Sequence, residues 1–208
     1  MKKVTLALAV AVALASSQVS AELFSVASGR SANVANYSQL SVEGGVQVGD
    51  LDFYGARGTF KLSDRLAAYG DLGIADFDYG DDGFAFGGGV VYTLSGLMSG
   101  VDTAVNGSFH LASGDDVDYT AFAVRGLFSG DIPTQDVTMN WYASLGLEFL
   151  SYEAEVCGFG SCVSADDSDT ELAFGGGVVL PIGPGEAYGG LEYVDDMMLA
   201  VGYRVGLQ

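Results

Sequence analysis

From residue 37 onward, apolar and polar residues alternate with a period of two, in short segments that end at clusters of Gly, Asp, Ser or Pro. Such alternation places successive side chains on opposite faces of a β-strand, and no helical period competes with it in this part of the chain. The chain is therefore expected to be all-β. The pattern predicts ten strands, over residues 37–44, 51–62, 66–78, 84–95, 101–112, 118–129, 137–153, 170–181, 187–194 and 197–207.

The connections between these strands alternate strictly between two kinds. One kind is tight or uncharged, at residues 63–65, 95–100, 129–135 and 182–185. The other kind is acidic, at residues 50–52, 76–82, 115–118, 153–169 and 195–196. An even number of strands with alternating connections places both chain ends on the side of the short turns, as in an antiparallel up-and-down barrel. We expect ten strands, with eight as the alternative.

Each predicted strand has one apolar face and one polar or small face. In the segment 101–112, Val101, Val105 and Phe109 share a face, and Asp102 and Asn106 share the other. When the strands are aligned by their turns, the aromatic residues of the apolar faces gather at two levels, which is typical of a transmembrane barrel. Ordinary aromatic placement in a secreted β-sandwich is the alternative. The two levels hold Phe84, Phe109, Phe149, Phe174 and Tyr193, and Phe60, Tyr92, Phe128, Trp141 and Tyr203.

Residues 1–21 have the pattern of a secretory signal peptide. Lys2 and Lys3 precede an apolar run over residues 4–15, and small residues lead to a cleavage site after Ala21. The apolar run is shorter than the ~20 residues of a membrane-spanning helix. Residues 22–36 are rich in Ser, Ala and Asn and show no clear alternation. We expect this stretch to be a tail on the short-turn side, with a partial plug of the barrel as the alternative.

Three segments carry a resemblance to a known group of proteins: residues 53–64, residues 85–92 and the closing residues 199–207. Together with the repeated strand pattern, they resemble the small outer-membrane β-barrels of Gram-negative bacteria, the group of the outer-membrane protein A transmembrane domain, the opacity proteins and porin-like barrels. The resemblance covers residues 37–208. It implies an outer-membrane barrel with periplasmic termini and a periplasmic N-terminal tail. It also implies contact with outer-membrane lipid and lipopolysaccharide, and with periplasmic chaperones and the barrel-assembly machinery.

Charge is distributed unevenly along the chain. There are 27 Asp and Glu residues but only 8 Lys and Arg, which excludes binding to a nucleic-acid backbone. Several charged residues fall on the inward face, where buried charges must pair. They are predicted to form ion pairs that hold a polar core shut, and a narrow gated pore is the alternative. These residues are Arg57, Lys61, Asp71, Asp102, Arg125, Glu148, Glu171, Glu192 and Arg204.

Cys157 and Cys162 are the only two cysteines. An exported chain meets an oxidising compartment, so this pair is predicted to form one small disulfide. A metal pair or a redox motif is disfavoured, because no His or second cysteine pair is nearby and the spacing is not Cys-x-x-Cys. Closing so short a loop contributes about 2 kcal/mol, so the bond pins a loop locally.

The acidic connections raise the question of cation binding. Asp76, Asp78, Asp81 and Asp82 cluster oxygen donors that suit Ca²⁺, but the full spacing of a calcium-binding loop and its terminal Glu are missing. A solvated acidic rim, or one bridged through cations to lipopolysaccharide, is the simpler interpretation.

Catalysis has little support in the sequence. The single histidine, His110, lies on the inward face with Ser113 three residues later, which does not match the lipid-facing His and Ser of outer-membrane deacylases. We expect no enzyme activity and no cofactor. The predicted role is structural or surface-interacting, through acidic extracellular loops that contact a ligand. The alternative role is a narrow channel with a weak preference for cations.

Overall fold

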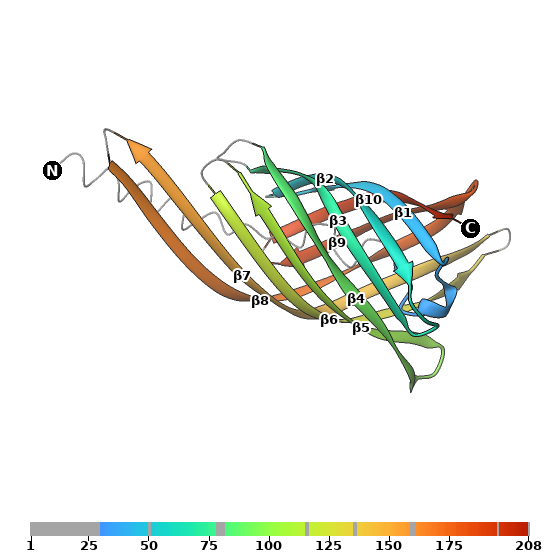
Figure 1. Ribbon diagram of the computed structural model, residues 1–208. Coiled ribbons are helices and arrows are strands. Elements are labelled where there is room, and N and C mark those ends of the chain that lie inside the picture. Colours follow the sequence, from blue (N-terminus) through green and yellow to red (C-terminus); the bar gives the residue numbers. More distant parts are fainter. Residues whose placement is uncertain are drawn as a thin grey trace.

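The computed structural model describes residues 30–207 apart from residues 50, 78–81, 115–116, 135–136, 159–160 and 195. The predicted signal peptide and residues 22–29 lie outside this part. Ten antiparallel strands follow one another, and the first pairs with the last to close a barrel (Figure 1). This confirms the predicted fold and the count of ten strands. The strands are β1 (Leu40–Val48), β2 (Leu51–Lys61), β3 (Leu66–Phe77), β4 (Gly83–Met98), β5 (Val101–Ser113), β6 (Val117–Pro133), β7 (Thr138–Gly158), β8 (Ser161–Ile182), β9 (Gly185–Val194) and β10 (Asp196–Leu207).

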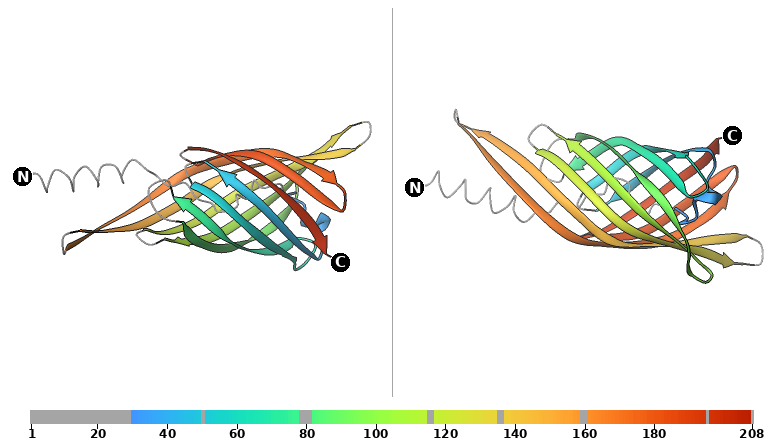
Figure 2. Two further views of the ribbon diagram at one scale, coloured as in Figure 1. Left: turned by 90° about the horizontal axis from the view of Figure 1, so that it is seen from above. Right: turned by 60° about the horizontal axis from the view of Figure 1, so that its bottom comes forward.

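The two ends of the barrel differ. The turn end holds the connections β2–β3, β4–β5, β6–β7 and β8–β9, together with the start of β1 and the last residues of β10. Gly100 and Gly183 have φ of 78° and 60° in two of these turns, a conformation that glycine adopts without strain. The opposite end, here the hairpin end, carries the long β7–β8 hairpin, which extends well past the other strands (Figure 2).

Several predicted strand ends differ from the structure by three residues or more: β1 ends at Val48 and not at residue 44, β4 at Met98 and not at 95, and β6 at Pro133 and not at 129. Two further differences have a structural reason. The first strand begins at Leu40 instead of residue 37, because the chain before it forms a short 3-10 helix, η1 (Val34–Asn36). The acidic stretch 153–169 was expected to be a loop. Its described residues, 153–158 and 161–169, belong to β7 and β8, whose backbones pair residue by residue from Asn140 opposite Val179 to Gly158 opposite Ser161. Pairing between two adjacent strands holds this stretch extended although its sequence shows little apolar alternation.

Burial alternates along the strands as the period of two predicted, with the apolar face outward. On β10, Met197, Leu199 and Val201 are exposed, whereas Met198 and Ala200 are buried. The interior face carries most of the buried charged side chains, including Glu43, Arg57, Asp71, Arg125 and Glu148. Among the described residues, no helix has the length and apolar character needed to cross a bilayer.

Inward-facing glycines leave the space that large side chains occupy inside the barrel. A Cβ added to Gly55 would lie 2.6 Å from the ring of Phe53, and one added to Gly73 would lie 2.5 Å from the same ring. A Cβ added to Gly87 would likewise overlap the ring of His110. Atoms this close would overlap, so these positions exclude any larger residue while the rings stay in place. Some of the glycines therefore leave room for the large side chains that fill the interior.

Candidate functional site

Residues 30–37, here the inner segment, lie inside the barrel at the turn end. The backbone N–H of Ala32 donates to Ser129 Oγ at 2.8 Å, and that of Val34 donates to Thr93 Oγ1 at 3.0 Å. Ala32 and Val34 are completely buried, in a cluster with side chains of β3, β4, β5 and β6. Residues 30–36 of the predicted tail thus lie inside the barrel, and residues 22–29 lie outside the described part.

A row of charged side chains runs around the interior wall in direct strand-to-strand register. Across β9, β10, β1, β2 and β3, each member of the row is the Cα partner of the next. Negative and positive side chains alternate along it. Alternation of this kind lets each buried charge face an opposite one, which offsets the cost of removing it from water. We call this set the charged row: Glu186, Arg204, Glu43, Arg57 and Asp71.

The contacts within the charged row are close. Arg204 Nη2 lies 2.7 Å from Glu186 Oε2, and Arg204 Nη1 lies 3.5 Å from Glu43 Oε2. Arg57 Nε lies 3.7 Å from Glu43 Oε1, and Arg57 Nη2 donates to Asp71 Oδ2 at 2.8 Å. Glu43, Arg57 and Asp71 are all nearly inaccessible to solvent. This part of the wall is therefore held by neighbouring strands that share buried charges.

Two further groups reach the charged row from elsewhere. From the inner segment, Arg30 Nη2 donates to Glu43 Oε1 at 2.9 Å. From β5, His110 Nε2 lies 2.8 Å from Asp71 Oδ2, across the glycine at position 87 of β4. The ring of Tyr69 stacks beneath two of the guanidinium groups, with the carbon Cζ of Arg57 at 4.2 Å and that of Arg30 at 5.4 Å from its centroid. The inner segment and the barrel wall thus share one network of ion pairs and hydrogen bonds.

A second ion-pair group crosses the lumen. Arg125 on β6 contacts Glu148 on β7, with 2.6 Å between Nη2 and Oε2, and also Glu192 on β9. Strand β8 lies between β7 and β9 in the barrel wall, so this arginine links strands that do not all pair with one another. All three side chains are buried. This group ties β6 and β7 to β9, the strand that also carries Glu186 of the charged row.

Three of the residues predicted to form interior ion pairs belong to neither of these two groups. Lys61 Nζ donates to the carbonyl of Ala35 at 2.8 Å and lies 3.1 Å from the exposed Asp64, at the turn end. Asp102 accepts from Asn33 Nδ2 at 3.3 Å. Glu171 is half-buried and stands opposite Glu148 in the β7–β8 register. Lys61 and Asp102 therefore hold the inner segment.

Sequence reasoning missed Arg30, Glu43 and Glu186. Glu43 alternates with apolar neighbours on β1, so its inward position could have been found from the period of two. Arg30 lies in a stretch without alternation, and only the folded chain brings it to Glu43. Glu186 lies just before the predicted start of its strand at residue 187, and the structure places it within β9.

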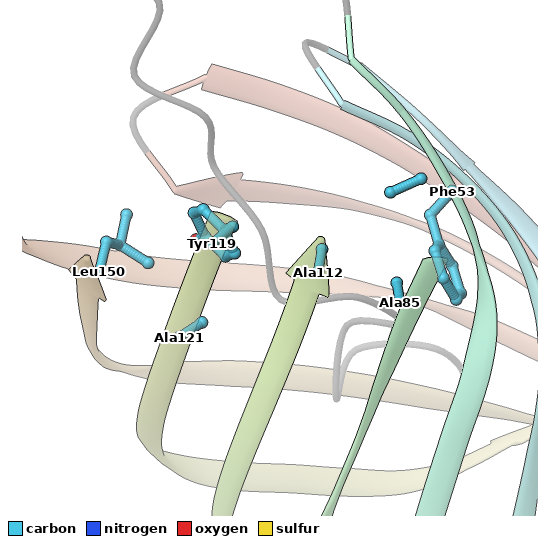
Figure 3. Close-up of a cluster of buried hydrophobic side chains, with 7 residues drawn as sticks. Phe53, Ala85, Ala112, Tyr119, Ala121 and Leu150 are labelled. Carbon is cyan, nitrogen blue, oxygen red and sulfur yellow. The ribbon is translucent and has the colours of Figure 1, made fainter. Parts of the chain in front are cut away.

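An apolar layer occupies the lumen towards the hairpin end. Figure 3 shows Phe53 on β2 and Tyr119 and Leu150 on β6 and β7 projecting into the interior from across the barrel, with alanines of β4, β5 and β6 between them. Phe53 and Tyr119 are 1% exposed. The lumen is thus filled at three levels: the inner segment, the ion pairs and this layer.

A cavity of about 470 Å³ lies beside the inner segment at the turn end. Its lining comes from the inner segment, from β1 and from β5 to β10, and polar groups dominate it. Arg30 and Tyr37 contribute from the inner segment, and Ser129, Glu186 and Arg204 from the wall. The inner segment thus contacts β6 through Ala32 and Ser129 and leaves this space beside β7 to β10.

The β7–β8 hairpin carries its own polar contacts. Tyr152 Oη donates to Asp167 Oδ2 at 3.3 Å, and burial together with this carboxylate raises the pKa of Tyr152. The backbone register places Cys157 directly opposite Cys162. Their side chains lie outside the described part, so the disulfide stays a prediction.

The candidate cation ligands do not form a cluster in the part of the chain that the structure describes. Asp76 and Asp82 are exposed near the hairpin end, whereas Asp78 and Asp81 lie outside the described residues. Within the described ranges, no three His, Cys, Asp or Glu side chains are arranged to hold a metal ion.

His110 and Ser113 have different environments. His110 is buried inside the barrel against Asp71, while Ser113 is exposed and donates to Asp118 Oδ1 at 2.6 Å. An odd separation along a strand places the two side chains on opposite faces. This geometry does not form a nucleophile and base pair.

The chain forms a small up-and-down β-barrel. Its shape is similar to that of the KdgM porin, with 10% identity, a TM-score of 0.43 and coverage of 81% of this chain and 99% of that one. It is also similar to the N-terminal β-barrel domain of Pseudomonas aeruginosa OprF, with 13% identity, a TM-score of 0.38 and coverage of 81% and 98%. Neisserial surface protein A gives 15% identity, a TM-score of 0.37 and coverage of 82% and 98%. No family model and no curated protein matches the sequence.

Proposed function

We propose that this protein is an integral outer-membrane barrel with a structural and surface-interacting role. Strand length supports the membrane location: β1, β2, β3, β9 and β10 have 9, 11, 12, 10 and 12 residues, close to the ~9–11 residues of a tilted transmembrane strand. Such a barrel needs an apolar outer surface, because its outer residues face lipid.

The outer surface of the barrel is apolar. Phe109, Phe122 and Phe149 are register partners on β5, β6 and β7, and all three are exposed. Near the turn end, Phe60, Tyr92 and Tyr203 are exposed as well. A water-soluble monomer rarely exposes such a continuous apolar surface. Aromatic side chains at both ends suit the two interfaces of a bilayer.

The filled lumen is the observation that favours a structural role over transport. The inner segment, the ion pairs around Arg57 and Arg125, and the apolar layer at Phe53 occupy the interior at successive levels. Side chains packed at these three levels favour a closed lumen over an open pore. The protein then acts through its surface, and the long β7–β8 hairpin offers the largest surface outside the barrel.

Conductance in a planar bilayer tests this role. Protein purified from membranes is expected to insert without producing a steady current. A reproducible open-channel current from the wild-type protein would contradict the closed lumen. The cavity of about 470 Å³ supports the alternative, a narrow cation-preferring channel, because it is a polar space inside the barrel at the turn end.

Labelling of single cysteines tests the orientation. In a background with Cys157→Ser and Cys162→Ser, the variant Thr170→Cys is expected to react with a membrane-impermeant maleimide on intact cells. The matched variant Ser63→Cys, exposed at the turn end, is expected to react only after the outer membrane is permeabilised. The reverse pattern would show that the hairpin faces the periplasm.

A further inference from the structure

The β7–β8 hairpin has an unpaired edge outside the barrel. Strand β9 pairs with β8 only as far as Ala173, which stands opposite Val194. Residues 161–172 of β8 pair with β7 alone, and the hairpin projects away from the other strands in all three views (Figures 1 and 2). On its other side β7 pairs with β6 up to Ala154, so the longer free edge belongs to β8.

Such an edge can pair with another strand. In an antiparallel strand about half of the backbone N–H and C=O groups point to each side, so half of those in residues 161–172 point away from β7. Proteins usually protect a long edge with proline, with charged side chains, with a bulge or with a covering segment, and the carboxylates of this edge disfavour pairing with a like-charged strand. Residues 161–172 contain no proline and no lysine, and no other element of the described chain pairs with them.

The negative charge of this edge favours a positively charged partner. Residues 161–172 contain Asp166, Asp167, Asp169 and Glu171 and no basic residue. Asp167 is exposed, and the facing strand adds the exposed Glu153. A second copy of this chain, added at the same edge, would place carboxylates against carboxylates, which is unfavourable. A segment with basic residues would meet opposite charges over residues 166–171 of the edge.

We propose that the β8 edge over residues 161–172 binds an extended, basic segment of another protein as an additional β-strand. Backbone hydrogen bonds supply the pairing, and the carboxylates select lysine- or arginine-rich partners. This inference rests on the proposed function, because it requires the hairpin to face the medium. It names the class of partner for that surface.

A synthetic peptide as long as the edge, with alternating Lys and Val, is a direct probe. Its binding to the full protein in detergent micelles can be followed by fluorescence anisotropy of a dye on the peptide. The same peptide with N-methyl groups on alternate amides keeps its charge but loses one edge of hydrogen bonds. It is expected to bind about tenfold more weakly. Equal binding of the two peptides would show mere charge adsorption and overturn the proposal.

Two variants locate the site. Replacing residues 152–167 with Asn-Gly joins Ser151 to Ser168, which are register partners, through a two-residue turn, and it removes most of the edge. This variant is expected to lose peptide binding while keeping the heat-modifiable mobility of a folded barrel on gels. The triple variant Asp167→Asn, Asp169→Asn, Glu171→Gln keeps the backbone edge, and it is expected to bind the Lys-Val peptide more weakly and with a smaller dependence on salt. Unchanged binding in the shortened variant would overturn the proposal.

The outcomes for the inference and for the proposed function are separable. If Thr170→Cys is labelled on intact cells but the Lys-Val peptide does not bind, the inference fails and the surface location stands. If Thr170→Cys is not labelled on intact cells, the proposed orientation fails, and the inference fails with it. Concentration-dependent self-association that disappears when residues 152–167 are replaced would show that a second copy occupies the edge, against the proposal.

Discussion

His110 on β5 reaches Asp71 on β3 across the intervening strand β4, with 2.8 Å between Nε2 and Oδ2. The two residues share one position in the sheet register, because Asp71 is the Cα partner of Gly87 and Gly87 is the partner of His110. Only a residue without a side chain at position 87 lets the imidazole pass over β4. The histidine thereby extends the charged row to β5.

Gly87→Ala tests this passage. The added methyl group would overlap the His110 ring and lie 2.5 Å from the Phe109 carbonyl oxygen, so we expect a loss of about 1–3 kcal/mol in unfolding free energy. Urea-induced unfolding in lipid vesicles, followed by tryptophan fluorescence, measures it. Gly107→Ala is the matched control, because a Cβ at position 107 meets nothing within 4 Å. Equal stability of the two variants would contradict the overlap.

Arg125→Ala should destabilise the barrel strongly. Its side chain contacts Glu148 and Glu192, all three are buried, and its removal leaves two carboxylates in the interior without this cation. Loss of one partner from a buried ion pair typically costs about 3–5 kcal/mol. Asp64→Ala removes the exposed partner of Lys61 and is expected to cost at most about 1 kcal/mol. The same urea titration compares them, and a small effect at Arg125 would refute the assigned role.

Arg30→Ala should loosen the inner segment. The variant loses the bond to Glu43 and the stacking on Tyr69, while the backbone hydrogen bonds of Ala32 and Val34 remain. We expect the unfolding free energy to fall by about 1–3 kcal/mol in the urea titration, because the buried Glu43 loses one of its cations. Arg65→Ala, at an exposed position in the β2–β3 turn, should change it by at most about 0.5 kcal/mol. Equal stability of the two variants would mean that Arg30 does not hold the inner segment in place.

Cys157 and Cys162 should be oxidised in protein purified from membranes. Register partners on adjacent strands are close enough for a bond to form, and the predicted compartment is oxidising. Mass spectrometry after alkylation, with and without prior reduction, detects the bond. Its reduction is expected to change the stability of the barrel by only about 2 kcal/mol, because it closes a short loop. Alkylation of both thiols without reduction would exclude the disulfide.

The strands could be predicted from the sequence because a barrel between lipid and a polar interior imposes the period of two on every strand. Ten strands were found, and β2, β3 and β5 match their predicted ranges within one residue at each end. The inner segment was harder, since Arg30 and Val34 owe their positions to partners on distant strands. The β7–β8 hairpin lay beyond pattern analysis because its acidic residues are held in strands by backbone pairing.

For the interior charges, the choice of inward face identified Arg57, Asp71, Arg125 and Arg204, since polar residues alternate with apolar ones on their strands. Which residues meet was not predictable without the register. Glu43 was passed over although it touches three arginines. A search for opposite charges at equal register positions on neighbouring strands would have found its partners Arg57 and Arg204.

Glu43 also links closure of the barrel to the position of the inner segment. It lies on the first strand, and it contacts Arg30 from the inner segment and Arg204 from the last strand, across the seam where β1 meets β10. Its carboxylate has both cations only when the last strand is paired with the first. A barrel whose seam is open therefore lacks one of the charges that surround the anchor of the inner segment.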